Sequence, residues 1–102
     1  MYKTTSLESW NEAVICLVDA LLGAISPNFR MIALAENDEG WLLRFFLEME
    51  NDLDREEILD VGTQFEVRYS SAIKYAIEIV IGAEELAWPD APSRVVYKRR
   101  EN

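Results

Sequence analysis

The 102-residue sequence has no histidine and only one cysteine, Cys16. Without histidine it lacks Ser-His-Asp triads, Cys-His pairs, histidine-containing zinc sites and the commonest general base. A single cysteine cannot form an internal disulfide, and the apolar residues around Cys16 are typical of a small buried thiol in a protein of the reducing cytosol. These absences exclude most hydrolase chemistry. We expect a protein that is not an enzyme, with no catalytic residue, metal ligand or cofactor.

Positive charge is scarce as well. Ten Lys and Arg residues stand against nineteen Asp and Glu residues, which gives a net charge of -9 at pH 7 and an isoelectric point near 4.4. A chain this acidic repels phosphate backbones and anionic lipid headgroups. We therefore expect no direct contact with nucleic acid or membrane, and a basic macromolecule as the partner.

No apolar run is long enough to span a bilayer. The longest near-apolar stretch, residues 13–25, is interrupted by Asp19 and is shorter than the roughly 20 residues that a membrane-spanning helix needs. The N-terminal segment leads into acidic residues and Trp10, and so does not resemble a signal peptide. We expect a soluble, cytoplasmic protein.

The residues that are present suit one domain over residues 1–102. Half of them are apolar and 11% are aromatic, which is enough to bury a core. A split would leave each half below the size at which a core usually supports itself. The sequence shows no repeat, interdomain linker or low-complexity tract.

Apolar residues recur at helical intervals from Trp10 to Ile25 and predict a first helix that continues up to Pro27. Thr5 and Glu8 have the spacing of a capping box at its start. The apolar arc covers more than half of the helix circumference. A second helix or another subunit should therefore flank this helix.

Two runs of strand length, Asn28 to Glu36 and Trp41 to Glu50, are joined by the polar residues 37–40 and predict a β-hairpin. The opposite faces of the second run differ, because Glu48 and Glu50 share one face with Arg44. The other face is apolar and must be core. It consists of Trp41, Leu43, Phe45, Leu47 and Met49.

The predicted second helix begins at Asp54, because Glu57 follows three residues later and Leu53 and Ile58 have the spacing of a hydrophobic staple. Its apolar stripe is narrower than that of the first helix. The stripe consists of Ile58, Val61, Phe65 and Tyr69.

Residues 74–81 alternate with the period of a half-buried strand, although residues 65–81 also fit an extension of the helix. Residues 84–92 are typical of a loop, and residues 94–99 of a last short strand. The predicted fold class is α+β. The order is α-β-β-α-β-β, with two helices packed on one face of a mostly antiparallel sheet.

Negative charge is concentrated in one quarter of the chain. From Glu36 to Asp60 there are ten acidic residues and two basic ones, a net of -8. Acids at a helix start complement the macrodipole, and a run of charge is often a plain solvated face. The excess is larger than capping needs, and crowded like charges destabilise a fold. We therefore expect the hairpin turn, the end of the second strand and the start of the second helix to form one acidic surface for a cationic partner.

Two patterns in the acidic segment also resemble metal sites. The segment from Asp52 begins like a calcium loop, but Glu57 stands where the loop needs glycine and Thr63 where it needs a bidentate glutamate. An EF-hand is therefore excluded. Glu48 and Glu50 have the spacing of a divalent-cation or acid/base pair on a strand face, although exposed carboxylate pairs are more often plain surface.

The loop Trp88-Pro89-Asp90 has two interpretations. Trp88 either pins the loop to the core, which we favour, or anchors a partner together with Asp90. The basic residues 98–100 are more typical of a frayed or solubilising strand end than of a nucleic-acid patch. They are also available to pair with the acidic surface.

Three segments, SPNFRM at residues 26–31, GWLLRF at residues 40–45 and DLDREE at residues 52–57, carry a family likeness. They resemble small immunity proteins of bacterial contact-dependent growth inhibition and related polymorphic toxin systems, over about residues 5–100. The resemblance implies a cytosolic protein that binds one cognate toxin domain, often a nuclease, and covers its active site or substrate-binding surface.

The acidic surface and the loop supply the predicted toxin-binding residues. They are Asp38, Glu39, Glu48, Glu50, Asp52, Asp54, Glu56, Glu57, Trp88 and Asp90. The main alternative is a homo-oligomeric structural or regulatory subunit, such as a homodimer, which the wide apolar arc of the first helix favours. A third hypothesis is an enzyme that uses the strand carboxylates with a metal.

Overall fold

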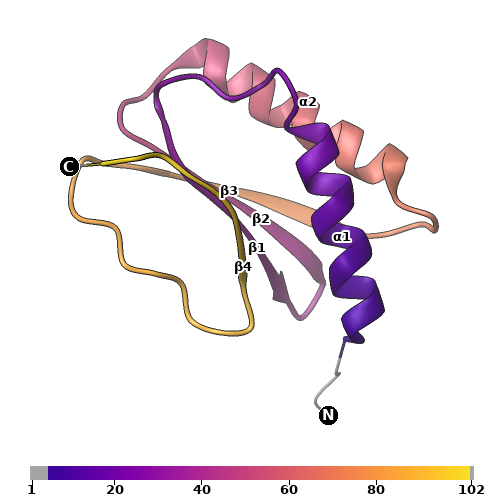
Figure 1. The fold of residues 1–102 in the computed structure, drawn as a ribbon. Coiled ribbons are helices and arrows are strands. Elements are labelled where there is room, and N and C mark those ends of the chain that lie inside the picture. The colour runs from indigo at the N-terminus through magenta and orange to yellow at the C-terminus, as the bar shows by residue number, and fades with distance from the viewer. Residues whose placement is uncertain (1–4, 102) are drawn as a thin grey trace.

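The computed structural model describes residues 5–101 (Figure 1). Residues 1–4, part of the segment judged unlike a signal peptide, lie outside the described residues. The described chain forms six elements in the predicted order α-β-β-α-β-β. They are α1 (Leu7–Ala20), β1 (Phe29–Asn37), β2 (Gly40–Leu47), α2 (Asp52–Arg68), β3 (Tyr75–Ile81) and β4 (Arg94–Lys98).

The four strands form one mixed sheet in the order β3-β2-β1-β4. β1 pairs with β2 and with β4 in antiparallel fashion, whereas β2 and β3 are parallel. Parallel neighbours need a crossover connection, and α2 provides it between β2 and β3. The α+β class and the element order are confirmed, and the prediction of a mostly antiparallel sheet omitted this parallel pair.

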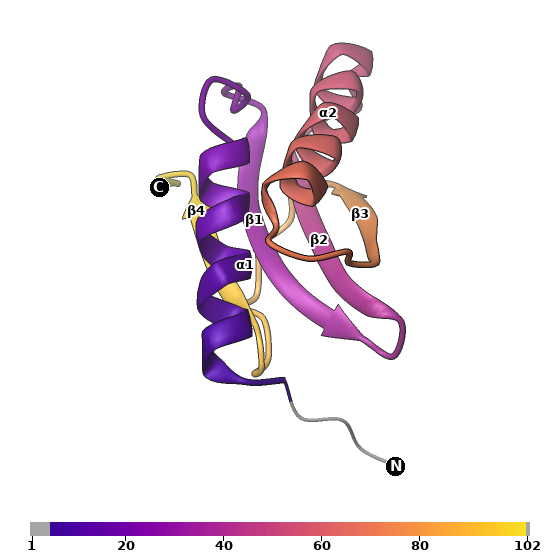
Figure 2. The same cartoon turned by 90° about the vertical axis from the view of Figure 1, so that its right-hand side faces the viewer.

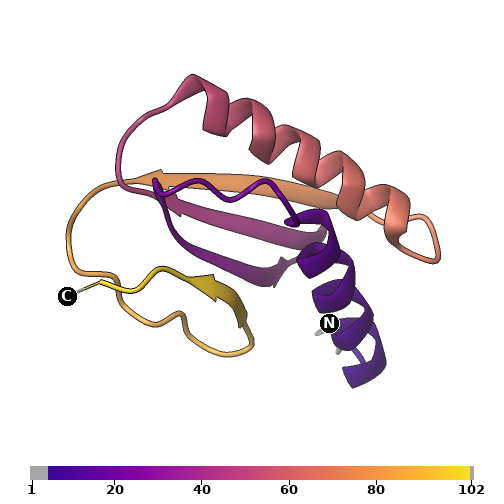
Figure 3. The same ribbon diagram turned by 45° about the horizontal axis from the view of Figure 1, so that its top comes forward.

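Both helices lie on the same face of the sheet, as predicted (Figures 2 and 3). Between the two layers the rings of Trp10 and Trp41 meet edge to face with centroids 4.9 Å apart, and those of Phe29 and Phe45 with centroids 6.3 Å apart. The predicted core face of β2 is buried as far as Leu47. Met49 was assigned to that face wrongly, because β2 ends at Leu47 and the Met49 side chain is 65% exposed.

The N-terminal cap of α1 is Ser6, not Thr5. The Ser6 hydroxyl accepts a hydrogen bond from the Ser9 amide, while the Thr5 hydroxyl donates to Glu36 of β1. The helix also ends earlier than predicted, because the chain turns after Ala20 and reaches a left-handed conformation at Gly23 (φ 81°). Part of the wide apolar arc lies against α2 and the sheet, as we expected for a flanking helix.

The N-terminal cap of α2 is Asn51, three residues before the predicted start. Its side-chain oxygen accepts a hydrogen bond from the Asp54 amide at 3.0 Å. Leu53 is 73% exposed, so the predicted hydrophobic staple is absent. The predicted apolar stripe is correct, since Ile58, Val61 and Phe65 are buried and Tyr69 packs against the core.

α2 ends at Arg68 and β3 begins at Tyr75, which confirms the predicted strand and rejects the longer helix. Gly62 explains how closely the two elements pack. A β-carbon at this position would lie 2.8 Å from the Ile77 side chain and 2.9 Å from the Tyr75 ring, so only glycine fits without a shift of these two side chains.

The C-terminal residues are fixed to the sheet by a charged network. The buried Arg30 guanidinium makes two hydrogen bonds of 2.8 Å to Glu101 and one to the Gly82 carbonyl. Arg99 donates to Glu48, to Glu101 and to the Pro27 carbonyl. The two guanidinium groups lower the pKa of Glu101 to about 2, mainly through the hydrogen bonds from Arg30. The chain end is therefore not frayed at Arg99.

Candidate partner-binding site

The predicted acidic residues do not form one continuous surface. Asp38 and Glu39 form the tight turn between β1 and β2, whereas Glu48 and the residues after it follow the opposite end of β2. β2 separates the two groups, and its eight residues span roughly 26 Å at about 3.3 Å per residue. The expectation of a single patch is therefore wrong, and the acidic segment supplies two separate sites.

Glu48 and Glu50 lie beyond the end of β2, so they do not share a strand face. Arg99 Nη2 lies 2.8 Å from Glu48 Oε1, and Arg55 pairs with Glu50 through two hydrogen bonds. The Arg55 hydrogen bond lowers the pKa of the Glu50 carboxyl. Both carboxylates are already paired with a guanidinium, which leaves little charge for a metal or a partner. Within residues 5–101 no three potential ligands come together in a metal-binding group.

Asp54 serves the fold rather than the surface. Its side chain is buried, and Oδ2 accepts a 2.9 Å hydrogen bond from Asn28 Nδ2. Asn28 also donates to the carbonyl and accepts from the amide of Met49, which fixes the loop between β2 and α2 to the start of β1. Asp54 was predicted to contact a partner, and in the free chain its side chain is buried and bonded to Asn28.

The acidic residues between Asp52 and Asp60, apart from Asp54, lie on the outer face of α2. They are Asp52, Glu56, Glu57 and Asp60, which we call the α2 acidic face. All four are exposed, and no Lys or Arg of residues 5–101 lies within ion-pairing distance of them. Asp52, Glu56 and Asp60 follow one another at intervals of four, so their side chains lie in a row and repel one another.

Apolar side chains flank these carboxylates. Leu53, Leu59 and Val67 are 73%, 63% and 73% exposed. The sequence prediction counted Asp60 as acidic without selecting it and did not select the three apolar residues. A helical wheel that begins at Asn51 identifies Asp60 and the three apolar residues as exposed, because they lie on the side of α2 away from the buried stripe of Ile58 and Phe65.

Trp88 does not pin its loop to the core. The side chain is 67% exposed and borders a groove with Val14, Ile15 and Val18 of α1 and Val95 of β4. The interpretation that we favoured from the sequence is wrong, and the tryptophan ring is accessible. Asp90 is exposed in the same loop.

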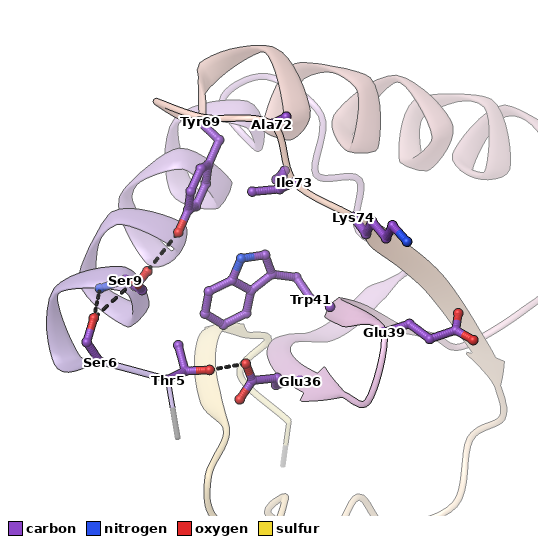
Figure 4. Close-up of a pocket in the computed structure, with 11 residues that line it drawn as sticks. Thr5, Ser6, Ser9, Glu36, Glu39, Trp41, Tyr69, Ala72, Ile73 and Lys74 are labelled. Carbon is purple, nitrogen blue, oxygen red and sulfur yellow. Dashed lines mark hydrogen bonds between the residues drawn. The ribbon is translucent and has the colours of Figure 1, made fainter. Parts of the chain in front are cut away.

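A cavity of about 560 Å³ opens between the N-terminus of α1, the β1–β2 turn and the chain between α2 and β3 (Figure 4). Its polar groups bond to one another: Thr5 donates to Glu36, and the Tyr69 hydroxyl donates to the Ser9 carbonyl at 3.4 Å. Burial raises the pKa of Tyr69, so the phenol stays protonated and acts as a donor. These contacts fasten the start of α1 to β1 and to the chain that follows α2.

Cys16 of α1 is buried, which confirms the sequence interpretation. Burial, followed by the nearby carboxylates Glu12 and Asp19, raises the pKa of its thiol. A protonated, buried thiol is a poor nucleophile.

A small α+β domain with an exposed row of carboxylates, unpaired within the part of the chain that the structure describes, and with apolar neighbours has the features of a protein that acts by binding another protein. The family model described as MafI2 immunity protein matches residues 11–101. The chain therefore belongs to the MafI2 immunity protein family, which confirms the resemblance to immunity proteins of polymorphic toxin systems. Comparison with curated proteins gave no match.

Membership of this family assigns the chain to toxin neutralisation and implies a cognate toxin as its partner. Immunity proteins are generally not enzymes and act by binding. Within residues 5–101, none of the helices has the length and apolar character needed to cross a membrane.

Proposed function

We propose that this immunity protein neutralises a basic nuclease toxin by placing the α2 acidic face in the cationic groove that binds the nucleic acid. The observation that supports this most strongly is the row of exposed carboxylates on α2, which have no ion-pair partner among residues 5–101. A nuclease needs cationic side chains to hold phosphates, and a row of carboxylates is a substitute for those phosphates. Neutralisation takes place in the cytoplasm, where such a toxin meets its substrate.

The apolar residues beside the carboxylates give the complex its lifetime. Complementary charge mainly speeds association, whereas buried apolar anchors slow dissociation. Leu53, Leu59 and Val67 are exposed in the free protein and offer such anchors. Glu48 and Glu50 contribute less charge to this interface because Arg99 and Arg55 already neutralise them.

The test compares two double charge reversals that change the net charge equally. Glu56→Lys with Asp60→Lys alters the α2 acidic face, and Asp38→Lys with Glu39→Lys alters the hairpin turn at the far end of β2. We expect the first pair to weaken binding to a catalytically inactive toxin domain by about 3 kcal/mol, roughly 100-fold, and the second by less than about tenfold. Calorimetry or biolayer interferometry measures both affinities.

Equal losses for the two pairs would show that only the net charge matters and would contradict an interface on α2. The nuclease assignment is tested separately. The active toxin domain should degrade RNA or DNA, and equimolar wild-type protein should stop the degradation. A toxin with no activity on nucleic acid would refute that part of the proposal.

A homo-oligomer is the second candidate because Ile15, Leu22 and Trp88 expose large apolar side chains. Light scattering distinguishes it from the first. A stable monomer at micromolar concentration would remove this candidate, and a stable dimer would support it.

A further inference from the structure

β3 leaves one side of its backbone without partners. The Lys74 carbonyl accepts from the Trp41 amide and the Gly82 amide donates to the Leu47 carbonyl, so the even-numbered residues of this stretch face β2. Because successive backbone groups alternate in direction along a strand, the odd-numbered residues face outward. Among the described residues, no partner is found for the outward N–H and C=O groups of Tyr75, Ile77, Ile79 and Ile81.

The opposite edge of the sheet is protected and β3 is not. β4 has five residues, carries Arg94 and Lys98, and pairs with β1 through a register shift. Short length, charge and irregular pairing are the features that keep edge strands from adding another strand. β3 has seven residues, no proline and no register shift, and its single charge, Glu78, is paired with Arg44.

The side chains along β3 suit an added strand. Val80 and Ile81 are 37% and 38% exposed at the end of the strand. Gly62 of α2 lies against β3. Leu59 precedes Gly62 by three residues and Glu66 follows it by four, so both side chains are on the same side of the helix as Gly62. Figure 2 shows β3 at the margin of the sheet beneath α2. An added strand would therefore lie beside the exposed face of α2.

A second copy of the chain suits this edge poorly. Antiparallel self-pairing over the full length of β3 would match outward-facing residues, such as Ile77 with Ile79. Each copy carries a net charge of -9, so two copies repel each other. Charge favours a basic partner instead.

We propose that β3 accepts an extended strand of the cognate toxin, which continues the sheet. This inference rests on the proposed function, because it takes the toxin to be basic. Backbone hydrogen bonds would provide affinity, and the side chains of the added strand would provide specificity. The toxin would thus contact both the β3 edge and the α2 acidic face.

Residue-resolved amide hydrogen exchange of the wild-type protein tests the proposal. The outward amides of Ile77 and Ile79 should exchange rapidly in the free chain and at least about tenfold more slowly in the complex with inactive toxin domain. Lys98 of β4 is the internal control, because its pairing with Met31 leaves its amide facing outward at the other edge of the sheet. The exchange rate of the Lys98 amide should be the same in the free chain and in the complex. Unchanged exchange at Ile77 and Ile79 in the saturated complex would overturn the proposal. Protection in the free chain that is lost on dilution would assign the edge to a second copy and would also overturn it.

A pair of variants at one position gives an independent test. Ile79→Pro removes the outward amide hydrogen, and proline is tolerated at such edge positions. Ile79→Ala retains the amide and is the control for lost packing. Binding of the toxin domain should be at least about tenfold weaker for Ile79→Pro than for Ile79→Ala, with both variants folded by circular dichroism. Equal affinities would contradict strand addition.

Failure of this inference is distinguishable from failure of the proposed function. Protection of the β3 amides together with full affinity of the Glu56→Lys, Asp60→Lys variant would refute the α2 interface and support strand addition. Loss of affinity in that variant, together with unprotected β3 amides in the wild-type complex, would support the α2 interface and refute strand addition.

Discussion

Asp54 and Asp60 lie on the same helix, yet they serve different purposes. Asp54 is buried and accepts a hydrogen bond from Asn28, whereas Asp60 faces solvent beside other unpaired carboxylates. The same contrast separates Glu48 and Glu50, each paired with an arginine, from Glu56 and Glu57. Part of the acidic segment therefore builds the fold, and the rest is exposed without an ion-pair partner among residues 5–101.

The contrast shows that a run of acidic residues in a sequence is not yet a binding surface. Buried and paired carboxylates contribute hydrogen bonds and ion pairs to stability, and their removal should destabilise the protein. Exposed unpaired carboxylates repel one another, and their removal should leave stability unchanged or raise it. Stability and toxin affinity should therefore respond to different members of the segment.

The largest effect on stability should come from the buried member of the pair. Asp54→Ala should lower the free energy of unfolding by about 2 kcal/mol, because it removes a charge-assisted hydrogen bond and leaves an Asn28 donor without this acceptor. Asp60→Ala should stay within about 0.5 kcal/mol of the wild type. Urea denaturation measures both, and equal losses would remove the distinction between the two carboxylates.

An intermediate effect is expected from Glu101 on acidification. Its folded-state pKa of about 2 lies below the ordinary value of 4.5, so its contribution to stability is complete above pH 4.5 and is lost as the pH falls toward 2. The melting temperature of Glu101→Gln should lie below that of the wild type at pH 6, and the two should converge near pH 2. A constant difference across this range would mean that the charge of Glu101 does not stabilise the fold.

The smallest expected effect on stability is an increase. Glu56→Lys together with Asp60→Lys relieves repulsion along the α2 acidic face and should raise the free energy of unfolding by about 0.3 kcal/mol. The same variant loses toxin affinity under the proposed function. A marked loss of stability in urea would show that the two carboxylates make structural contacts.

Hydrophobic periodicity was sufficient to predict the elements of this fold. The alternation from Trp41 to Leu47 defined the core face of β2, and the stripe from Ile58 to Phe65 defined the buried face of α2. These patterns are reliable because burial of apolar side chains dominates the stability of a domain. The family likeness, which the segments around Asn28, Trp41 and Asp52 suggested, was confirmed by the family model.

The sequence could not show where polar side chains find their partners. The Asn28–Asp54 and Arg99–Glu48 contacts join residues 26 and 51 positions apart, and no local pattern predicts them. The helix starts were misplaced because Ser6 and Asn51 competed with other capping residues nearby. The parallel pairing of β3 depends on how α2 crosses the sheet, which the strand's own residues do not encode.

Amide chemical-shift mapping of the labelled protein, titrated with inactive toxin domain, tests the proposed interface most directly. The account predicts that the largest changes fall on α2 between Asp52 and Val67 and on the outward amides of β3, with those of the β1–β2 turn among the smallest. Changes concentrated at Asp38 and Glu39, or around Trp88 and α1, with α2 unaffected, would contradict it.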